Sequence, residues 1–124
     1  MNEGVGDAMP GAYIEEYYGA ATGALLASRV IGNGHPSLLF FFASGDTYSE
    51  EKDRVLKDLY TRGKFLLSTY KLDYEKEEDL KRRFGVTTED TVVLVDGEGK
   101  AKQSIVGATE DDLRLLLSSS LTGE

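Results

Sequence analysis

The stretch SLLFFFASGDTYSEEK, residues 37–52, joins an apolar run to a charged segment through a small loop. The run SLLFFFA is apolar on both faces, which is typical of a central strand covered by helices on each side of a sheet. The charged segment predicts a helix from about Asp46 to Thr61. Asp46 and Thr47 are both suitable N-caps, and Glu50 would lie near the positive end of the helix dipole. A buried strand followed at once by a helix indicates an α/β fold.

The composition is that of one globular domain and argues against several classes of partner. The chain has 124 residues, of which 40% are hydrophobic and 29% charged. Its net charge of −8 would repel phosphates, so we expect no nucleic-acid partner. The longest apolar run, 37–43, is far shorter than the roughly 20 residues of a membrane helix, so we expect no membrane insertion by this segment. Because cysteine is absent, thiol redox chemistry, disulfides and thiolate metal sites are excluded.

The remaining pattern predicts a mixed sheet between two layers of helices. An Asp-Gly turn at residues 96–97 separates two strand-like runs, which is a strong hairpin signal. A βαβ half followed by a ββα half implies a mixed central sheet with helices on both faces. We expect flexible tails at 1–11 and 121–124 around a domain spanning 12–120. The further predicted elements are an extended segment at 13–18, helices at 19–31 and 75–86, strands at 64–74, 91–96 and 101–107, and a last helix begun by a Thr109–Asp112 capping box.

Three strings, in this order, resemble the thioredoxin family. LLFFFAS (38–44) resembles the strand that leads into the active-site loop, and KLDYEKEEDLKRRFGV (71–86) resembles the strand–helix stretch that follows. TVVLVDGEGKAKQSIVGATEDDLRLLL (91–117) is similar to the terminal hairpin and helix. The resemblance covers about residues 13–118. It implies an α/β, thioredoxin-like fold with a mixed central β-sheet, helices on both faces, and a C-terminal β-hairpin and helix.

The same resemblance implies that the catalytic parts of the family are replaced. Asp46 stands in place of the nucleophilic cysteine, and Ser49 in place of the resolving cysteine. Asp90 stands where the family carries a cis-proline, and Phe40 where many members carry a buried acid. Since thiol–disulfide exchange needs a thiolate and a second thiol, we expect a redox-inactive domain and no enzyme. The positions aligned with the family's Trp-Cys-x-x-Cys loop are Gly45, Asp46, Thr47, Tyr48 and Ser49.

Each replacement has a structural and a functional interpretation. Asp46 either only caps the helix or also contacts a partner, and Tyr48 either packs on the neighbouring loop or forms part of a binding surface. If the fold is thioredoxin-like, Asp46 should lie close to Asp90 and its neighbour Glu89. Paired acids can act in catalysis, but a serine nucleophile needs a nearby base, and the single histidine is expected at the far end of the strand. We expect no catalytic residue, metal or cofactor.

The preferred hypothesis is a module that binds a protein or an extended peptide. In the active family, a groove beside the cysteine loop holds extended polypeptide by backbone hydrogen bonds, and losing the cysteines need not remove that groove. The alternatives are a structural module of a larger assembly and a non-thiol enzyme that uses Asp46, Ser49 and Asp90. The N-terminal Gly-x-Tyr segment and the non-proline loop resemble extracytoplasmic, membrane-tethered bacterial domains. The candidate binding residues are Gly45, Asp46, Thr47, Tyr48, Ser49, Glu89, Asp90 and Thr91.

Overall fold

The computed structural model describes residues 11–18 and 23–118 of the chain. The predicted tails, apart from Gly11, and the first part of the predicted helix at 19–31 therefore lie outside the described residues. Within those two ranges, no helix is both long enough and apolar enough to cross a membrane.

The centre of the fold is a five-stranded sheet with the strand order β1-β3-β2-β4-β5. The central strand β2 (Ser37–Phe42) pairs in parallel with β3 (Ser68–Asp73) and antiparallel with β4 (Thr91–Val95). The short strand β1 (Tyr13–Ile14) extends the sheet beyond β3, and β5 (Ala101–Val106) forms a hairpin with β4. The predicted mixed sheet and C-terminal hairpin are confirmed.

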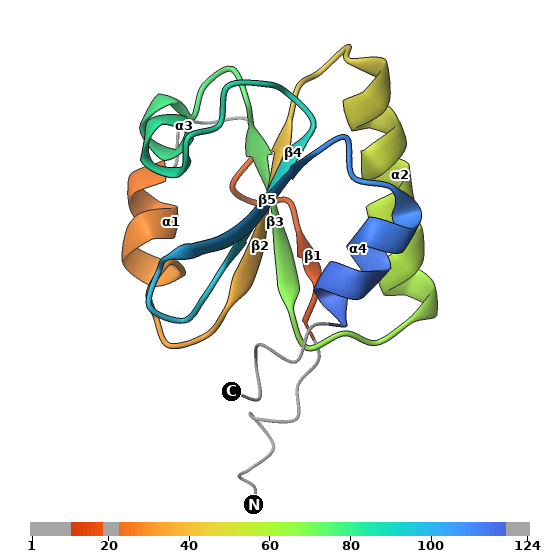
Figure 1. The fold of residues 1–124 in the computed structure, drawn as a ribbon, viewed down its shortest axis with the longest axis horizontal. Helices are drawn as coiled ribbons and strands as arrows, with labels where there is room; N and C mark the ends of the chain where they lie inside the picture. Colours follow the sequence, from red (N-terminus) through yellow and green to blue (C-terminus); the bar gives the residue numbers. More distant parts are fainter. Residues whose placement is uncertain (1–10, 19–22, 119–124) are drawn as a thin grey trace, which may run out of the picture.

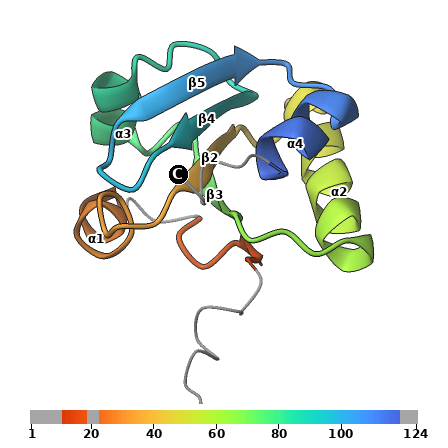
Figure 2. The ribbon, with the colours of Figure 1, turned by 60° about the horizontal axis from the view of Figure 1, so that its bottom comes forward.

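Four helices within the described residues cover the two faces of this sheet. Helices α1 (Gly23–Arg29) and α3 (Glu78–Phe84) lie on one face, and α2 (Thr47–Arg62) and α4 (Glu110–Leu117) lie on the other (Figures 1 and 2). The α4 capping box predicted at Thr109 and Asp112 is present. The three-layer α/β arrangement is therefore the one expected from the order of the sequence patterns.

The central strand is buried along its whole length because both of its faces are covered. Successive side chains of a strand point to opposite faces. Leu38, Phe40 and Phe42 accordingly join the core under α2 and α4. Leu39 and Phe41 join the core under α1 and α3. This explains why SLLFFFA shows no polar alternation.

Two elements begin later than predicted. The strand expected from residue 64 starts at Ser68, because Ser68 pairs with Ser37, the first residue of β2, and the earlier residues have no partner in that strand. The helix expected from residue 75 starts at Glu78. Residues 75–77 belong to a turn instead of a first helical turn. In this turn the Asp73 carbonyl accepts hydrogen bonds from the N–H groups of Lys76 and Glu77.

Candidate functional site

Strand register brings three loops together at one end of the sheet. Phe41 near the end of β2 pairs with Thr91, the first residue of β4. Thr91 in turn pairs with Val106, the last residue of β5. The chain after β2, the chain before β4 and the chain after β5 therefore meet at this end. This is also where α2 begins.

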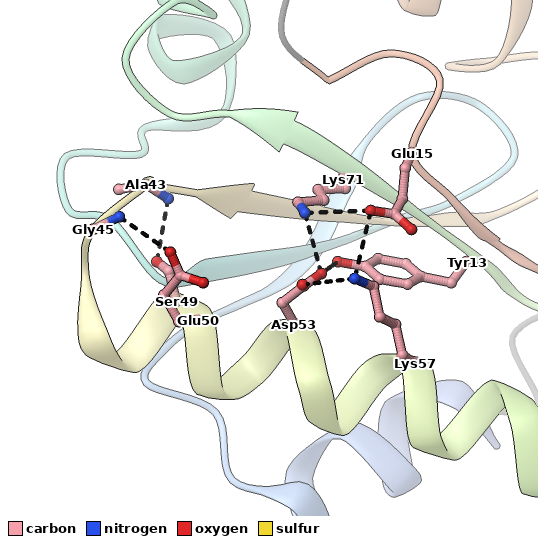
Figure 3. A network of polar contacts seen from close by, with 9 residues as sticks. All are labelled: Tyr13, Glu15, Ala43, Gly45, Ser49, Glu50, Asp53, Lys57 and Lys71. Carbon is pink, nitrogen blue, oxygen red and sulfur yellow. Dashed lines mark hydrogen bonds and ion pairs between the residues drawn. The ribbon is translucent and has the colours of Figure 1, made fainter.

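The loop between β2 and α2 is held by its own hydrogen bonds. Asp46 is the N-cap of α2, and its Oδ2 accepts from the Ser49 N–H at 2.9 Å. The Asp46 N–H donates to the Ala43 carbonyl at 3.1 Å. Gly45 adopts φ 88° and donates its N–H to Glu50 Oε2 at 3.2 Å (Figure 3). The predicted helix cap at Asp46 is therefore present, and Asp46 also stays half-exposed.

Ser49 serves the structure of this loop. Its side chain is fully buried, and its Oγ accepts from the Ala43 N–H at 3.2 Å (Figure 3). His35 precedes β2, whereas Ser49 lies beyond the other end of that strand. A non-thiol reaction at Ser49 would therefore lack access for a substrate and a neighbouring histidine base.

Asp90 is the most constrained residue of the site. Its φ of 62° places it in the left-handed region, which is uncommon for any residue other than glycine. Its N–H donates to the Phe41 carbonyl at 3.1 Å, and its carbonyl accepts from the Gly107 N–H at 2.9 Å. These two bonds tie the main chain of Asp90 to both neighbouring strands. The correspondence between Asp90 and the proline of the thioredoxin family stays a prediction.

The Asp90 carboxylate is buried without a hydrogen-bond partner. The residue is 4% exposed, and neither carboxylate oxygen receives a hydrogen bond from the described part of the chain. Lys52 Nζ lies 3.9 Å from Asp90 Oδ2, which is within ion-pair range but too long for a hydrogen bond. Burial raises the pKa of Asp90 above its usual value, Lys52 opposes the rise, and the negative charge of Asp46 adds to it.

These loops border an open cavity of about 430 Å³. That volume is within the range of small-ligand sites, about 300–1,000 Å³. Two large side chains on its wall face solvent, since Tyr48 is 72% exposed and Val106 is 59% exposed. The expectation that Asp46 lies near Glu89 and Asp90 is met, because all three border this cavity. The full lining is Asp46, Tyr48, Thr88, Glu89, Asp90, Val106 and Gly107.

The other four candidate residues do not line the cavity. Gly45 and Thr47 are exposed beside it, and Ser49 is buried beneath the loop. Thr91 is buried, and its Oγ1 donates to the Thr88 carbonyl at 2.6 Å. These residues shape the loops that carry the cavity wall.

Comparison with known proteins identifies the architecture. No protein-family model matches the sequence, and no curated protein matches it. Solved structures do match. A mutant thioredoxin from Halobacterium salinarum is 23% identical with a TM-score of 0.70, and the match covers 93% of this chain and 95% of that one. The Malassezia sympodialis thioredoxin has 15% identity and a TM-score of 0.68, covering 89% and 92%. The fold is thioredoxin-like. Identities this low show the fold alone.

A thioredoxin-like fold without cysteine has no thiol chemistry. The sequence contains no cysteine, so neither a thiolate attacker nor a resolving thiol is available. Among the described residues, no group of three or more His, Asp or Glu side chains is placed to hold a metal ion. The side chains at this end of the thioredoxin-like fold offer charge, hydrogen bonding and apolar contact.

Sequence reasoning did not find Thr88, Val106 and Gly107. Thr88 lies two residues before Asp90 and belongs to the same loop. The other two residues lie at the end of the second hairpin strand. An antiparallel pairing of 101–107 with 91–95 already implies that this end returns to the start of β4. The predicted hairpin pairing could therefore have placed Val106 and Gly107 beside the loop that precedes β4.

A second polar cluster lies on α2, further along the helix than Ser49 and Glu50 (Figure 3). Asp53 of α2 accepts a hydrogen bond from the Tyr13 hydroxyl at 2.6 Å and pairs with Lys71 Nζ of β3 at 3.3 Å. Lys57 and Glu15 complete the cluster. Burial works to raise the pKa of Asp53, but the hydrogen bonds and positive charges around it prevail and hold that pKa below its usual value. This cluster fastens β1 to the thioredoxin-like core.

Proposed function

We propose that this chain is a redox-inactive thioredoxin-like domain that binds a protein or an extended peptide in the cavity beside the β2–α2 loop. The observation that carries the proposal is the pair of exposed side chains, Tyr48 and Val106, on the wall of a cavity bordered by acids. Tyrosine offers a large contact area at a low entropy cost and is enriched where binding energy concentrates.

The main chain beside the cavity supports an extended ligand. Asp90 uses both of its main-chain groups in hydrogen bonds to the sheet. The N–H and carbonyl of Glu89 make no hydrogen bond within the described part of the chain. A segment that lies along the cavity can pair with these groups as an added strand does.

The test is a pull-down from the native source with the full chain as bait and Tyr48→Ala as the variant. Leu115→Ala is the matched control, because Leu115 is 74% exposed on α4, a helix that does not contribute to the cavity. We expect a partner that is retained by the wild type and Leu115→Ala and lost by Tyr48→Ala. Partners that all three baits retain equally would contradict binding at this cavity.

A structural role at the edge of the sheet is the second candidate. Strand β5 is the outermost strand beside β4, and most of its side chains are exposed. Unpaired strand edges are common places for another chain to dock. Partners that the Tyr48→Ala variant still binds would favour docking at this edge and a structural module of a larger assembly.

A further inference from the structure

The cavity carries a negative charge with no cation on its wall. Three of the seven lining residues are acids, namely Asp46, Glu89 and Asp90, and none of the seven is basic. Asp46 uses one carboxylate oxygen, Oδ2, to cap α2. Lys52 approaches Asp90 from outside this lining and makes no hydrogen bond to it. Clefts lined by one sign of charge attract ligands of the opposite sign.

Asp90 supplies a second, independent sign of a ligand. A buried carboxylate without a hydrogen bond is unfavourable, and such a group in a folded protein calls for an explanation. The two main-chain hydrogen bonds hold the residue at the cavity wall. They do not involve the carboxylate, whose two oxygens accept no hydrogen bond from the described residues and remain available as acceptors for a donor in the cavity.

The apolar part of the wall favours one kind of cation. The exposed ring of Tyr48 offers a face on which a planar cation can stack. Val106 offers apolar surface to an aliphatic stem. A guanidinium is planar, stacks on aromatic rings and donates two parallel hydrogen bonds to a carboxylate, whereas an ammonium is a strongly hydrated point charge.

We propose that the cavity receives an arginine side chain presented by an extended segment of a partner protein, with Asp90 as its buried acceptor and Tyr48 as its stacking surface. This inference rests on the proposed function, since it names the partner chemistry of the same cavity. Glu89 then has two roles, because its carboxylate attracts the cation while its main chain pairs with the segment.

The test is an NMR titration of the isotopically labelled full chain with blocked peptides of about seven residues, enough to span the cavity as an added strand. The peptides are built from Gly, Ser and Ala and carry Arg, Lys or Leu at the centre. We expect the Arg peptide to shift the amide signals of Tyr48, Glu89 and Val106. Its affinity should be at least about tenfold higher than that of the Leu peptide, and the affinity of the Lys peptide should lie between the two.

Charge-removing variants locate the interaction. Asp90→Asn should lower the affinity for the Arg peptide about tenfold and leave that for the Leu peptide unchanged. Asn tolerates the left-handed backbone of this position, so the variant keeps the loop. Asp58→Asn is the control, because it changes the net charge equally at an exposed residue of α2 that pairs with Arg62. Glu89→Gln, at the half-exposed rim, gives a second variant that leaves the Asp90 backbone alone.

Several results would overturn the inference. Equal affinities for the Arg and Leu peptides would show that Asp90 does not bind a cation. Equal losses of Arg-peptide affinity in Asp90→Asn and Asp58→Asn would show the same. Binding of N-acetylarginine amide as tight as that of the Arg peptide would mean that no extended segment is needed. If all peptides bind alike at Tyr48, the arginine proposal fails while binding at the cavity stands. Only a pull-down in which every partner is retained by Tyr48→Ala would remove both proposals.

Discussion

At the scale of single residues, Asp90 combines two features that do not favour stability. Its backbone lies in the left-handed region, and its carboxylate is buried with only Lys52 nearby. The raised pKa means that the folded protein holds the Asp90 proton more tightly than the unfolded chain does. Ionised Asp90 therefore opposes folding, which is the pattern expected where a group is kept for a ligand.

Replacing this charge should stabilise the free domain. We expect Asp90→Asn to raise the free energy of unfolding at neutral pH by about 1 kcal/mol, because a buried carboxylate without a hydrogen bond is removed. The gain should be complete above the raised pKa of Asp90. It should shrink as the pH falls toward the ordinary value of 3.8, since wild-type Asp90 then becomes protonated.

Urea denaturation at neutral pH and at about pH 3.5 measures this difference. Asp58→Asn again serves as the control and should change stability by less than about 0.5 kcal/mol at neutral pH. A loss of stability in Asp90→Asn at neutral pH would mean that the Lys52 interaction outweighs burial.

At the scale of elements, the start of α2 joins stability and binding in one short loop. Asp46 caps the helix, Gly45 turns the chain, and Ser49 anchors the loop to Ala43. The next residue in the loop, Thr47, begins the helix, and Tyr48 projects from its first turn. A variant that disturbs the cap would therefore also disturb the proposed binding surface, which makes Tyr48 a cleaner target than Asp46.

The cap itself can be tested separately. Asp46→Ala should lower the free energy of unfolding by about 1 kcal/mol, because the Ser49 N–H loses its acceptor. Asp46→Asn should retain most of that stability while removing the charge. Thermal or urea unfolding of the two variants distinguishes the effects, and equal stability of Asp46→Ala and the wild type would show that the cap is dispensable.

At the scale of the whole molecule, the Asp53 cluster connects parts that are distant in the sequence. Tyr13 from β1, Asp53 from α2 and Lys71 from β3 meet on one face of the sheet. Lys71 Nζ also lies 4.2 Å from the centre of the Phe42 ring on β2. Phe40 of β2, the position where the resemblance to the thioredoxin family predicts an acid, packs in the core on this face.

Removing one partner of the Asp53–Lys71 ion pair should destabilise the fold strongly, whereas replacing both partners by apolar side chains should not. We expect Asp53→Ala to lower the free energy of unfolding by about 3 kcal/mol, because it leaves the buried Lys71 ammonium with only the more exposed Glu15. The double variant Asp53→Leu with Lys71→Met should recover most of this loss, since apolar side chains of similar volume can replace a buried ion pair.

A double-mutant cycle by urea denaturation measures the coupling. Additive losses from the two single changes would show that Asp53 and Lys71 act independently. In that case β1 would be held by its strand pairing and by the aromatic contact of Tyr13 with Tyr60 rather than by charge.

Local chemistry explains which features could be predicted. The strand at 37–43, the capping residues Asp46 and Thr109, and the hairpin turn follow from periodicity and from side chains that bond to their own backbone. The late starts of β3 and α3 escaped prediction, because one depends on the partner strand and the other on a turn around Asp73.

The sequence by itself therefore determined the class of fold and the absence of thiol chemistry, since both depend on local patterns and on composition. Only the tertiary structure decided that Asp46, Asp90 and Val106 border one cavity, that the Asp90 carboxylate is buried without a hydrogen bond, and that Lys71 pairs with Asp53. The physical reason is that these contacts join residues far apart in the chain. Their meeting depends on strand register and helix packing, which no short segment specifies alone.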